Sequence, residues 1–170
     1  MFTMKLIKSF LILTLLCTLL SCSEDEATPE AFPGVPSGEI APVEERYEIL
    51  TGAVESSARL SSSTSKWWKH EVSKVSFTCD QPDLDLSATN AYISFDTSGE
   101  LMGRYGETGI PYKVATWKFS TDKTQVIIYS DMFDREVTFT FTELNNESVV
   151  YASKQSEAGC TATTWEKFVQ

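Results

Sequence analysis

Apolar and polar residues alternate along the second half of the chain, most regularly between Glu136 and Glu143. Val137, Phe139 and Phe141 fall on one side of an extended chain there, and threonines fall on the other side. Successive side chains of a β-strand point to opposite faces of the sheet. The alternation therefore predicts a strand with one face in a core and the other face in water.

Eight such segments occur, separated by short clusters of Asp, Asn, Ser, Thr and Gly that favour hairpin turns. The expected strands are Trp67–Thr78, Asn90–Asp96, Glu100–Tyr105, Tyr112–Phe119, Gln125–Ser130, Glu136–Glu143, Ser148–Lys154 and Thr161–Val169. A strand every 8–12 residues or so is typical of a sandwich or barrel, and closure of the sheet removes its two unpaired edges. The sequence predicts an all-β domain over residues 66–170, folded as an eight-stranded antiparallel up-and-down barrel.

The first 21 residues follow a different pattern, with two lysines and then an apolar run from Phe10 to Leu20. A basic start and a short apolar run are typical of a secretory signal peptide, and a membrane span needs roughly 20 apolar residues. The sequence Leu19-Leu20-Ser21-Cys22 resembles the bacterial lipobox, whose cysteine carries the lipid. We expect residues 1–21 to be a lipoprotein signal peptide and Cys22 to be the membrane anchor, with an ordinary signal peptide as the alternative.

Residues 22–45 contain seven acidic residues, no Lys or Arg, and four of the six prolines. Such a segment buries too little apolar surface to fold alone, and proline stiffens it. We expect a semi-stiff tether. The acidic run after Cys22 resembles the signal that exports Bacteroidetes lipoproteins to the outer face of the outer membrane. Surface exposure on the outer membrane is therefore the expected location, and a linker with no sorting role is the alternative.

Residues 46–65 allow two interpretations. Tyr47, Leu50, Val54 and Ala58 fall at helical spacing, which predicts a short helix packed on the barrel. Gly52 and a run of Ser and Thr residues favour more linker instead.

Two cysteines remain in the barrel domain once Cys17 is removed with the signal peptide and Cys22 is lipidated. Cys79 ends the first expected strand and Cys160 begins the last one. Barrel closure pairs these strands antiparallel, so we expect a disulfide in an oxidising envelope. Two free thiols are the alternative.

The formal net charge of −10 disfavours nucleic-acid binding, because neutralising phosphates requires a basic face. No phosphate-binding loop, nucleophile elbow or zinc-binding helix motif occurs, and the chain has one histidine, His70. We therefore expect no enzymatic activity, no metal site and no cofactor.

Several segments together resemble the lipocalin-like lipoproteins of Bacteroidetes, which are small calycin-type barrels carried on a lipobox. The resemblance covers about residues 66–170. It rests on Trp67-Trp68, Ala91–Asp96 with Ser98-Gly99-Glu100, Tyr112, Trp117–Ser120 and Phe139–Leu144. The Gly-x-Trp start of true lipocalins is replaced by Ser65-Lys66-Trp67. The resemblance implies a fold and a location more than an activity, because most members have no assigned ligand.

Aromatic residues form the candidate site of the expected barrel. Those that could line its interior are Trp68, Trp117, Phe119, Phe139, Phe141, Tyr151 and Trp165. A small barrel either fills with side chains or holds one small ligand, so these residues form either a packed core or a binding cavity.

Two functions follow from these alternatives. A hollow barrel would bind a small apolar or amphipathic ligand, or a glycan, at its open end. A filled barrel would be a structural or interaction lipoprotein whose loops contact an envelope or host protein, for example as a protease inhibitor.

Overall fold

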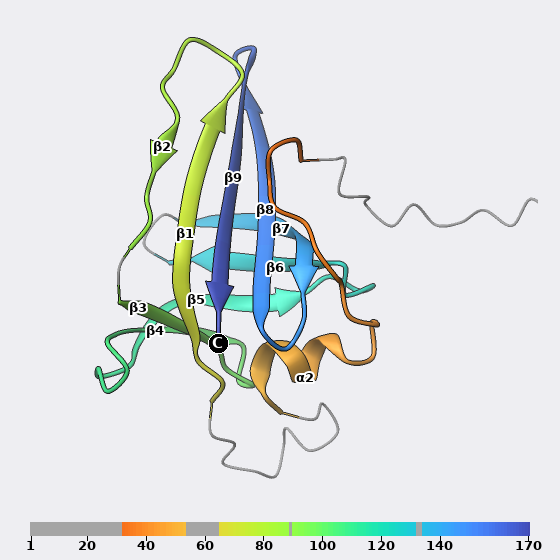
Figure 1. Ribbon diagram of the computed structural model, residues 1–170, viewed down its shortest axis with the longest axis vertical. Coiled ribbons are helices and arrows are strands. Elements are labelled where there is room, and N and C mark those ends of the chain that lie inside the picture. Colours follow the sequence, from red (N-terminus) through yellow and green to blue (C-terminus); the bar gives the residue numbers. More distant parts are fainter. Residues whose placement is uncertain (1–31, 54–64, 89, 132–133) are drawn as a thin grey trace, which may run out of the picture.

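The computed structural model describes residues 32–53, 65–88, 90–131 and 134–170. These residues form one short helix and nine strands (Figure 1). The elements are α2 (Arg46–Thr51), β1 (Trp68–Phe77), β2 (Leu84–Asp85), β3 (Ala91–Phe95), β4 (Glu100–Tyr105), β5 (Tyr112–Phe119), β6 (Gln125–Ser130), β7 (Arg135–Leu144), β8 (Ser148–Glu157) and β9 (Cys160–Val169).

The sheet is a closed antiparallel barrel. Strand β1 pairs with β3, each later strand pairs with the next one along the chain, and β9 pairs back with β1. This is the all-β, eight-stranded, up-and-down barrel that the sequence predicts, and it is consistent with a lipocalin-like fold. All eight expected strands are present. Strand β8 runs to Glu157 rather than ending at Lys154, because its polar second half pairs with β9.

The pairing around the barrel is uneven. Strands β8 and β9 pair along their whole lengths, and β1 follows β9 from Lys69 to Phe77. Strands β1 and β3 pair only through Trp68↔Ile93 and Lys69↔Tyr92. Beyond that point β1 continues alongside β9, while β3 to β7 run across behind them (Figure 1).

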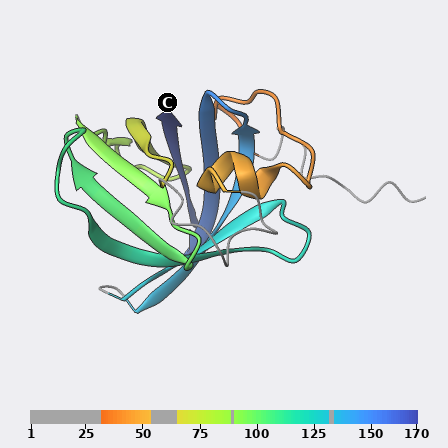
Figure 2. The same ribbon diagram turned by 90° about the horizontal axis from the view of Figure 1, so that it is seen from below.

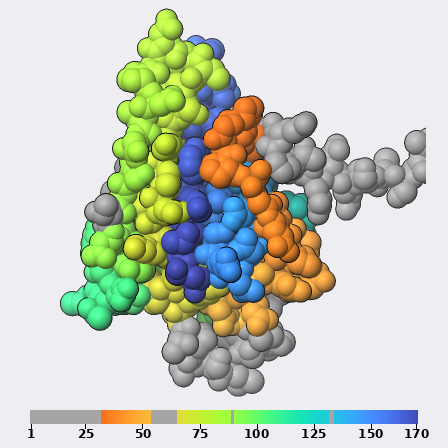
Figure 3. Space-filling model, viewed as in Figure 1, coloured from red at the N-terminus to blue at the C-terminus, as the bar shows by residue number. Residues whose placement is uncertain are grey.

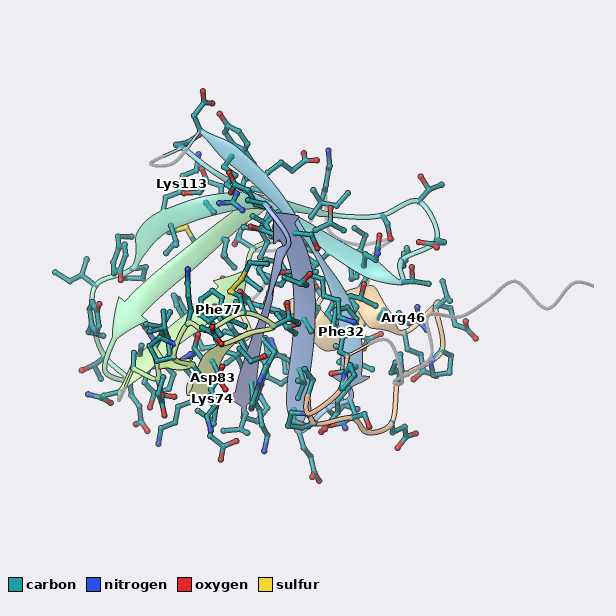
Figure 4. All side chains as sticks on the ribbon, turned by 90° about the horizontal axis from the view of Figure 1, so that it is seen from above. Phe32, Arg46, Lys74, Phe77, Asp83 and Lys113 are labelled. Atoms are coloured by element: carbon teal, nitrogen blue, oxygen red, sulfur yellow. A yellow bond between two sulfur atoms is a disulfide. The ribbon has the colours of Figure 1, made fainter. Side chains whose placement is uncertain are left out.

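Residues 83–88 cover the edge of β1 that β3 leaves unpaired. Strand β2 pairs there with Lys74 and Val75. The Phe77 N–H donates to the Asp83 carboxylate at 3.2 Å, and both residues are labelled in Figure 4. The Ser73 N–H donates to the Ser87 hydroxyl at 3.1 Å. This two-residue strand adds to the eight predicted strands and lies outside the closed barrel.

Helix α2 closes one end of the barrel (Figure 2). Leu50 is fully buried, and its carbonyl accepts a hydrogen bond from the Trp68 indole N–H at 2.9 Å. Tyr47 packs against Trp117 at the end of β5, with ring centres 6.4 Å apart. The helix ends at Thr51, and Gly52 follows it with a φ of +79°, which suits a residue without a Cβ atom. The expected helix therefore forms, although Val54 and Ala58 lie outside the described residues.

Residues 32–45, called the strap below, run along the outside of the barrel beside β7 and β8 (Figure 3). The N–H of Gly38 donates to the Thr142 carbonyl at 2.9 Å, and the N–H of Ala41 donates to the Leu144 carbonyl at 2.8 Å. Phe32 is buried, and the Lys154 ammonium lies 5.1 Å from its ring centre. The sequence predicts a free tether over residues 22–45, whereas residues 32–45 pack against the barrel in the structure. Apolar residues between the prolines attach this segment to the folded domain.

The expected disulfide is confirmed. Cys79 and Cys160 are bonded, with Cα atoms 5.3 Å apart, and the bond is yellow in Figure 4. The register explains the pairing, because Phe77 lies opposite Ala162 and the two cysteines follow just beyond that pair. The disulfide therefore joins the end of β1 to the start of β9.

Candidate functional site

The barrel contains a cavity of about 530 Å³. Pockets that hold small molecules have volumes of roughly 300–1,000 Å³, so this one is large enough for a small ligand. Most of its walls are apolar, and these side chains are Ile93, Leu101, Val114, Ala115, Ile128, Val137, Phe139 and Phe168. The polar lining residues are Ser130, Arg135, Tyr151, Ser153, Gln155, Thr164 and Glu166.

The cavity opens at the end of the barrel away from α2. Val114, Arg135 and Gln155 line it and are exposed to solvent. They lie near the start of β5, at the start of β7 and near the end of β8. Helix α2 instead packs at the start of β1 and the end of β5. A ligand would therefore enter from the end that carries the disulfide.

Below the cavity, the closed end is filled by a packed aromatic layer. Trp68, Phe95 and Phe141 are almost completely buried. The Phe95 and Trp117 rings meet edge to face with their centres 5.2 Å apart. The sequence left open whether the barrel is packed or hollow. The structure has both parts, a filled layer next to α2 and a cavity above it.

Six of the seven expected interior aromatics divide between these levels. Phe139 and Tyr151 line the cavity. Four others belong to the packed layer or lie against it, and these are Trp68, Trp117, Phe119 and Phe141. Trp165 lies between Thr164 and Glu166, which both line the cavity. Because neighbouring side chains on a strand point to opposite faces, Trp165 points to the outside of the barrel.

Glu166 is the acidic group inside the cavity, and the sequence analysis did not select it. Its carboxylate accepts a hydrogen bond from the Tyr151 hydroxyl at 2.8 Å. Burial raises the pKa of Glu166, while hydrogen bonds from Tyr151 and Ser73 and the charge of His70 act in the opposite direction. Burial and the nearby carboxylate raise the pKa of Tyr151 well above its ordinary value, so its hydroxyl stays protonated and donates.

The Tyr151 ring, whose hydroxyl donates to this carboxylate, packs against two other aromatic rings. The Tyr151 ring centre lies 4.7 Å from that of Phe139 and 5.6 Å from that of Phe168. On the β1 side, the His70 ring meets Phe168 edge to face at 5.2 Å. The cavity therefore combines apolar walls with one carboxylate bordered by aromatic rings.

The mouth of the cavity carries exposed apolar side chains from the hairpin between β4 and β5. Tyr105 and Tyr112 stack with ring centres 6.2 Å apart, and Ile110 is 88% exposed at the turn. Gly103 gives these side chains room, since a Cβ atom there would lie 2.7 Å from a Val114 methyl group. The apolar lining thus continues from the cavity onto its rim.

Metal and membrane features are limited in the part of the chain that the structure describes. No group of three or more His, Cys, Asp or Glu side chains there could hold a metal ion. No helix in the same residues is long and apolar enough to cross a bilayer. The expected signal peptide and Cys22 lie outside the described residues.

No protein-family model matches this chain, and no curated protein matches it. The structure belongs to the class of closed eight-stranded barrels with an apolar cavity. Membership of the lipocalin-like lipoproteins stays a prediction from the sequence.

Proposed function

We propose that the barrel is a binding module that holds a small apolar or amphipathic ligand in its cavity. The observation that carries this proposal is the cavity of about 530 Å³ with mostly apolar walls and one open end. Each Å² of apolar ligand surface removed from water there would contribute about 25 cal/mol to binding. The apolar walls favour such a ligand over a glycan, which needs many hydrogen-bonding partners.

The cavity also favours binding over the alternative of a structural protein with a filled barrel. The packed layer occupies only the end next to α2, and the space above it is large enough for a ligand. We propose binding without a catalytic step.

We further propose that the module is anchored in the cell envelope through a lipid on Cys22, on the outer face of the outer membrane. The support is the sequence Leu19-Leu20-Ser21-Cys22 and the acidic run that follows it. Several acyl chains on one cysteine would anchor the protein stably, since each buried methylene contributes about 0.8 kcal/mol.

Ligand binding is tested with N-phenylnaphthylamine, a neutral apolar fluorophore that brightens when it leaves water. Val137 lines the cavity, so Val137→Trp places a bulky ring in it, reduces the space for a ligand and should weaken binding about tenfold. Thr138→Trp is the matched control, because it adds the same ring to the exposed face of the same strand. Equal affinity of the wild type and Val137→Trp, or no binding by the wild type, would contradict the proposal.

The anchor is tested by cell fractionation in the native host. Cys22→Ala should move the protein out of the membrane fraction, because the acyl chains have lost their attachment site. Cys17→Ala is the control and should leave the protein in that fraction. Retention of the Cys22→Ala protein in the membrane fraction would refute the lipid anchor.

A further inference from the structure

Glu166 is an unusual group for a cavity that otherwise takes apolar ligands. It lies on β9 between β8 and β1, with its carboxylate inside the barrel. A carboxylate away from water is costly unless an opposite charge or several hydrogen-bond donors compensate it. Hydroxyl groups of Tyr151 and Ser73 supply donors. They supply no positive charge.

The basic groups around the cavity do not form an ion pair with this carboxylate in the described residues. From β1, the His70 charge acts on Glu166, but its Nδ1 atom lies 3.1 Å from both the N–H and the carbonyl oxygen of Ala88. From β7, Arg135 lies at the exposed mouth, where its guanidinium donates to the Gln155 side chain. The Glu166 carboxylate in the cavity wall thus has no ion-pair partner among the residues that the structure describes.

The rings beside Glu166 favour a positive charge at this place. Tyr151, Phe139 and Phe168 all line the cavity, and the Tyr151 ring centre lies 4.7 Å from that of Phe139 and 5.6 Å from that of Phe168. Aromatic faces attract ammonium groups, and the attraction is strongest where water is excluded. A carboxylate next to aromatic rings is therefore a site for an ammonium group.

We propose that the cavity selects amphipathic ligands with a cationic amine head group, which pairs with Glu166 while the apolar part of the ligand fills the remaining space. This inference rests on the proposed binding function and names the chemical class of its ligand. The ammonium supplies a positive charge directly to this carboxylate, which is partly buried in the cavity wall. An anionic head group at the same depth would be repelled by Glu166, and a neutral hydroxyl would form a hydrogen bond without neutralising the charge.

The inference is tested by calorimetric titration with three ligands that share a ten-carbon chain, namely decylamine, decanol and decanoic acid at neutral pH. The protein is the mature chain with Cys22→Ala, so that no lipid tail of its own can enter the cavity. We expect decylamine to bind at least about tenfold more tightly than decanol, because an ion pair in a desolvated site exceeds a neutral hydrogen bond by about that factor. Decanoic acid should bind most weakly.

Glu166→Gln should remove this preference, leaving decylamine and decanol with affinities within about twofold of each other. Glu157→Gln is the matched control, because Glu157 is an exposed acid at the open end of β8, and it should keep the preference. Thermal unfolding followed by circular dichroism verifies that each variant is folded.

The possible failures are distinct. If decylamine and decanol bind equally to the wild type, or if Glu166→Gln keeps the preference, the head-group inference is wrong while the binding function stands. If decanoic acid binds best, the inference is also overturned. If none of the three ligands binds and N-phenylnaphthylamine does not bind either, the proposed function itself fails.

Discussion

Replacing Leu50 by alanine removes three carbon atoms from the side chain through which α2 enters the closed end of the barrel. Leu50 is fully buried in the cluster that includes Trp68 and Phe141. The helix has only six residues, and the side chains around Leu50 are closely packed. The space that the substitution leaves therefore stays largely unfilled. Leucine-to-alanine changes at fully buried sites destabilise by about 2–5 kcal/mol.

We therefore expect Leu50→Ala to lower the free energy of unfolding by about 3 kcal/mol, which corresponds to a fall in melting temperature of about 10 °C for a domain of this size. Urea and thermal unfolding, followed by tryptophan fluorescence and circular dichroism, measure the change. Leu84→Ala is the matched control, because Leu84 is 43% exposed on β2, and it should cost less than about 0.5 kcal/mol. Affinity for N-phenylnaphthylamine should stay unchanged, because Leu50 does not line the cavity.

Equal stability of Leu50→Ala and Leu84→Ala would refute the reasoning, since it would mean that α2 is not part of the cooperative core. Loss of ligand affinity in a folded Leu50→Ala protein would separately contradict the division into a packed layer and a cavity. Both measurements are made on the same samples, so a general folding defect is distinguished from a local effect.

Three further changes test other parts of the structure. Replacing Cys79 and Cys160 by serine should lower the free energy of unfolding by about 4 kcal/mol, because the disulfide closes a loop with a sequence separation of 81 residues. An unchanged urea midpoint after reduction of the wild-type disulfide would contradict this. The folded-state pKa of Glu166 is raised by burial, so its contribution to stability falls as the pH rises through that pKa. Glu166→Gln should therefore gain stability relative to the wild type between pH 4 and pH 7, and a constant difference in urea unfolding would disprove it. Arg46→Met removes hydrogen bonds to two backbone carbonyl groups and should cost about 2 kcal/mol in the same assay, whereas a neutral effect would show that this buried arginine does not fix the helix.

Most of the barrel could be predicted because its strands carry local patterns. In β7, Val137 and Phe139 line the cavity and Phe141 enters the core, as the alternation of the sequence implies. Strand β2 could not be predicted, because two exposed residues between Asp83 and Leu86 have no periodicity. Its position depends on the unpaired edge of β1, which is a property of the assembled sheet.

The strap shows how composition can mislead at the boundary of a domain. Residues 32–45 are acidic and contain three prolines, which indicates a linker. Phe32, Ile40 and Ala41 nevertheless provide enough apolar surface to lie against the barrel, and backbone groups of β7 supply hydrogen bonds. Isolated apolar residues in a polar segment give no periodic pattern, so their burial depends on a surface far away in the sequence.

The candidate site was predicted in part. Size and aromatic character identified Phe139 and Tyr151, and the same criterion selected Trp165, which points outward. Strand β9 carries apolar residues on both faces, because Trp165 and Phe168 are an odd number of residues apart and so point to opposite sides of the sheet. A one-residue shift of register exchanges the faces, so Glu166 could be assigned to the interior only once the pairing with β8 was known.

The cover that residues 83–88 place over β1 also affects how copies of this protein behave toward one another. Beyond Lys69, the backbone groups of β1 on the side away from β9 would form a template on which another chain could add a strand. Side-chain oxygens of Asp83 and Ser87 and the short strand β2 occupy that template instead. A second molecule would have to displace these groups before its own strand could pair with the edge of β1. Residues 83–88 therefore disfavour aggregation through edge-to-edge strand pairing.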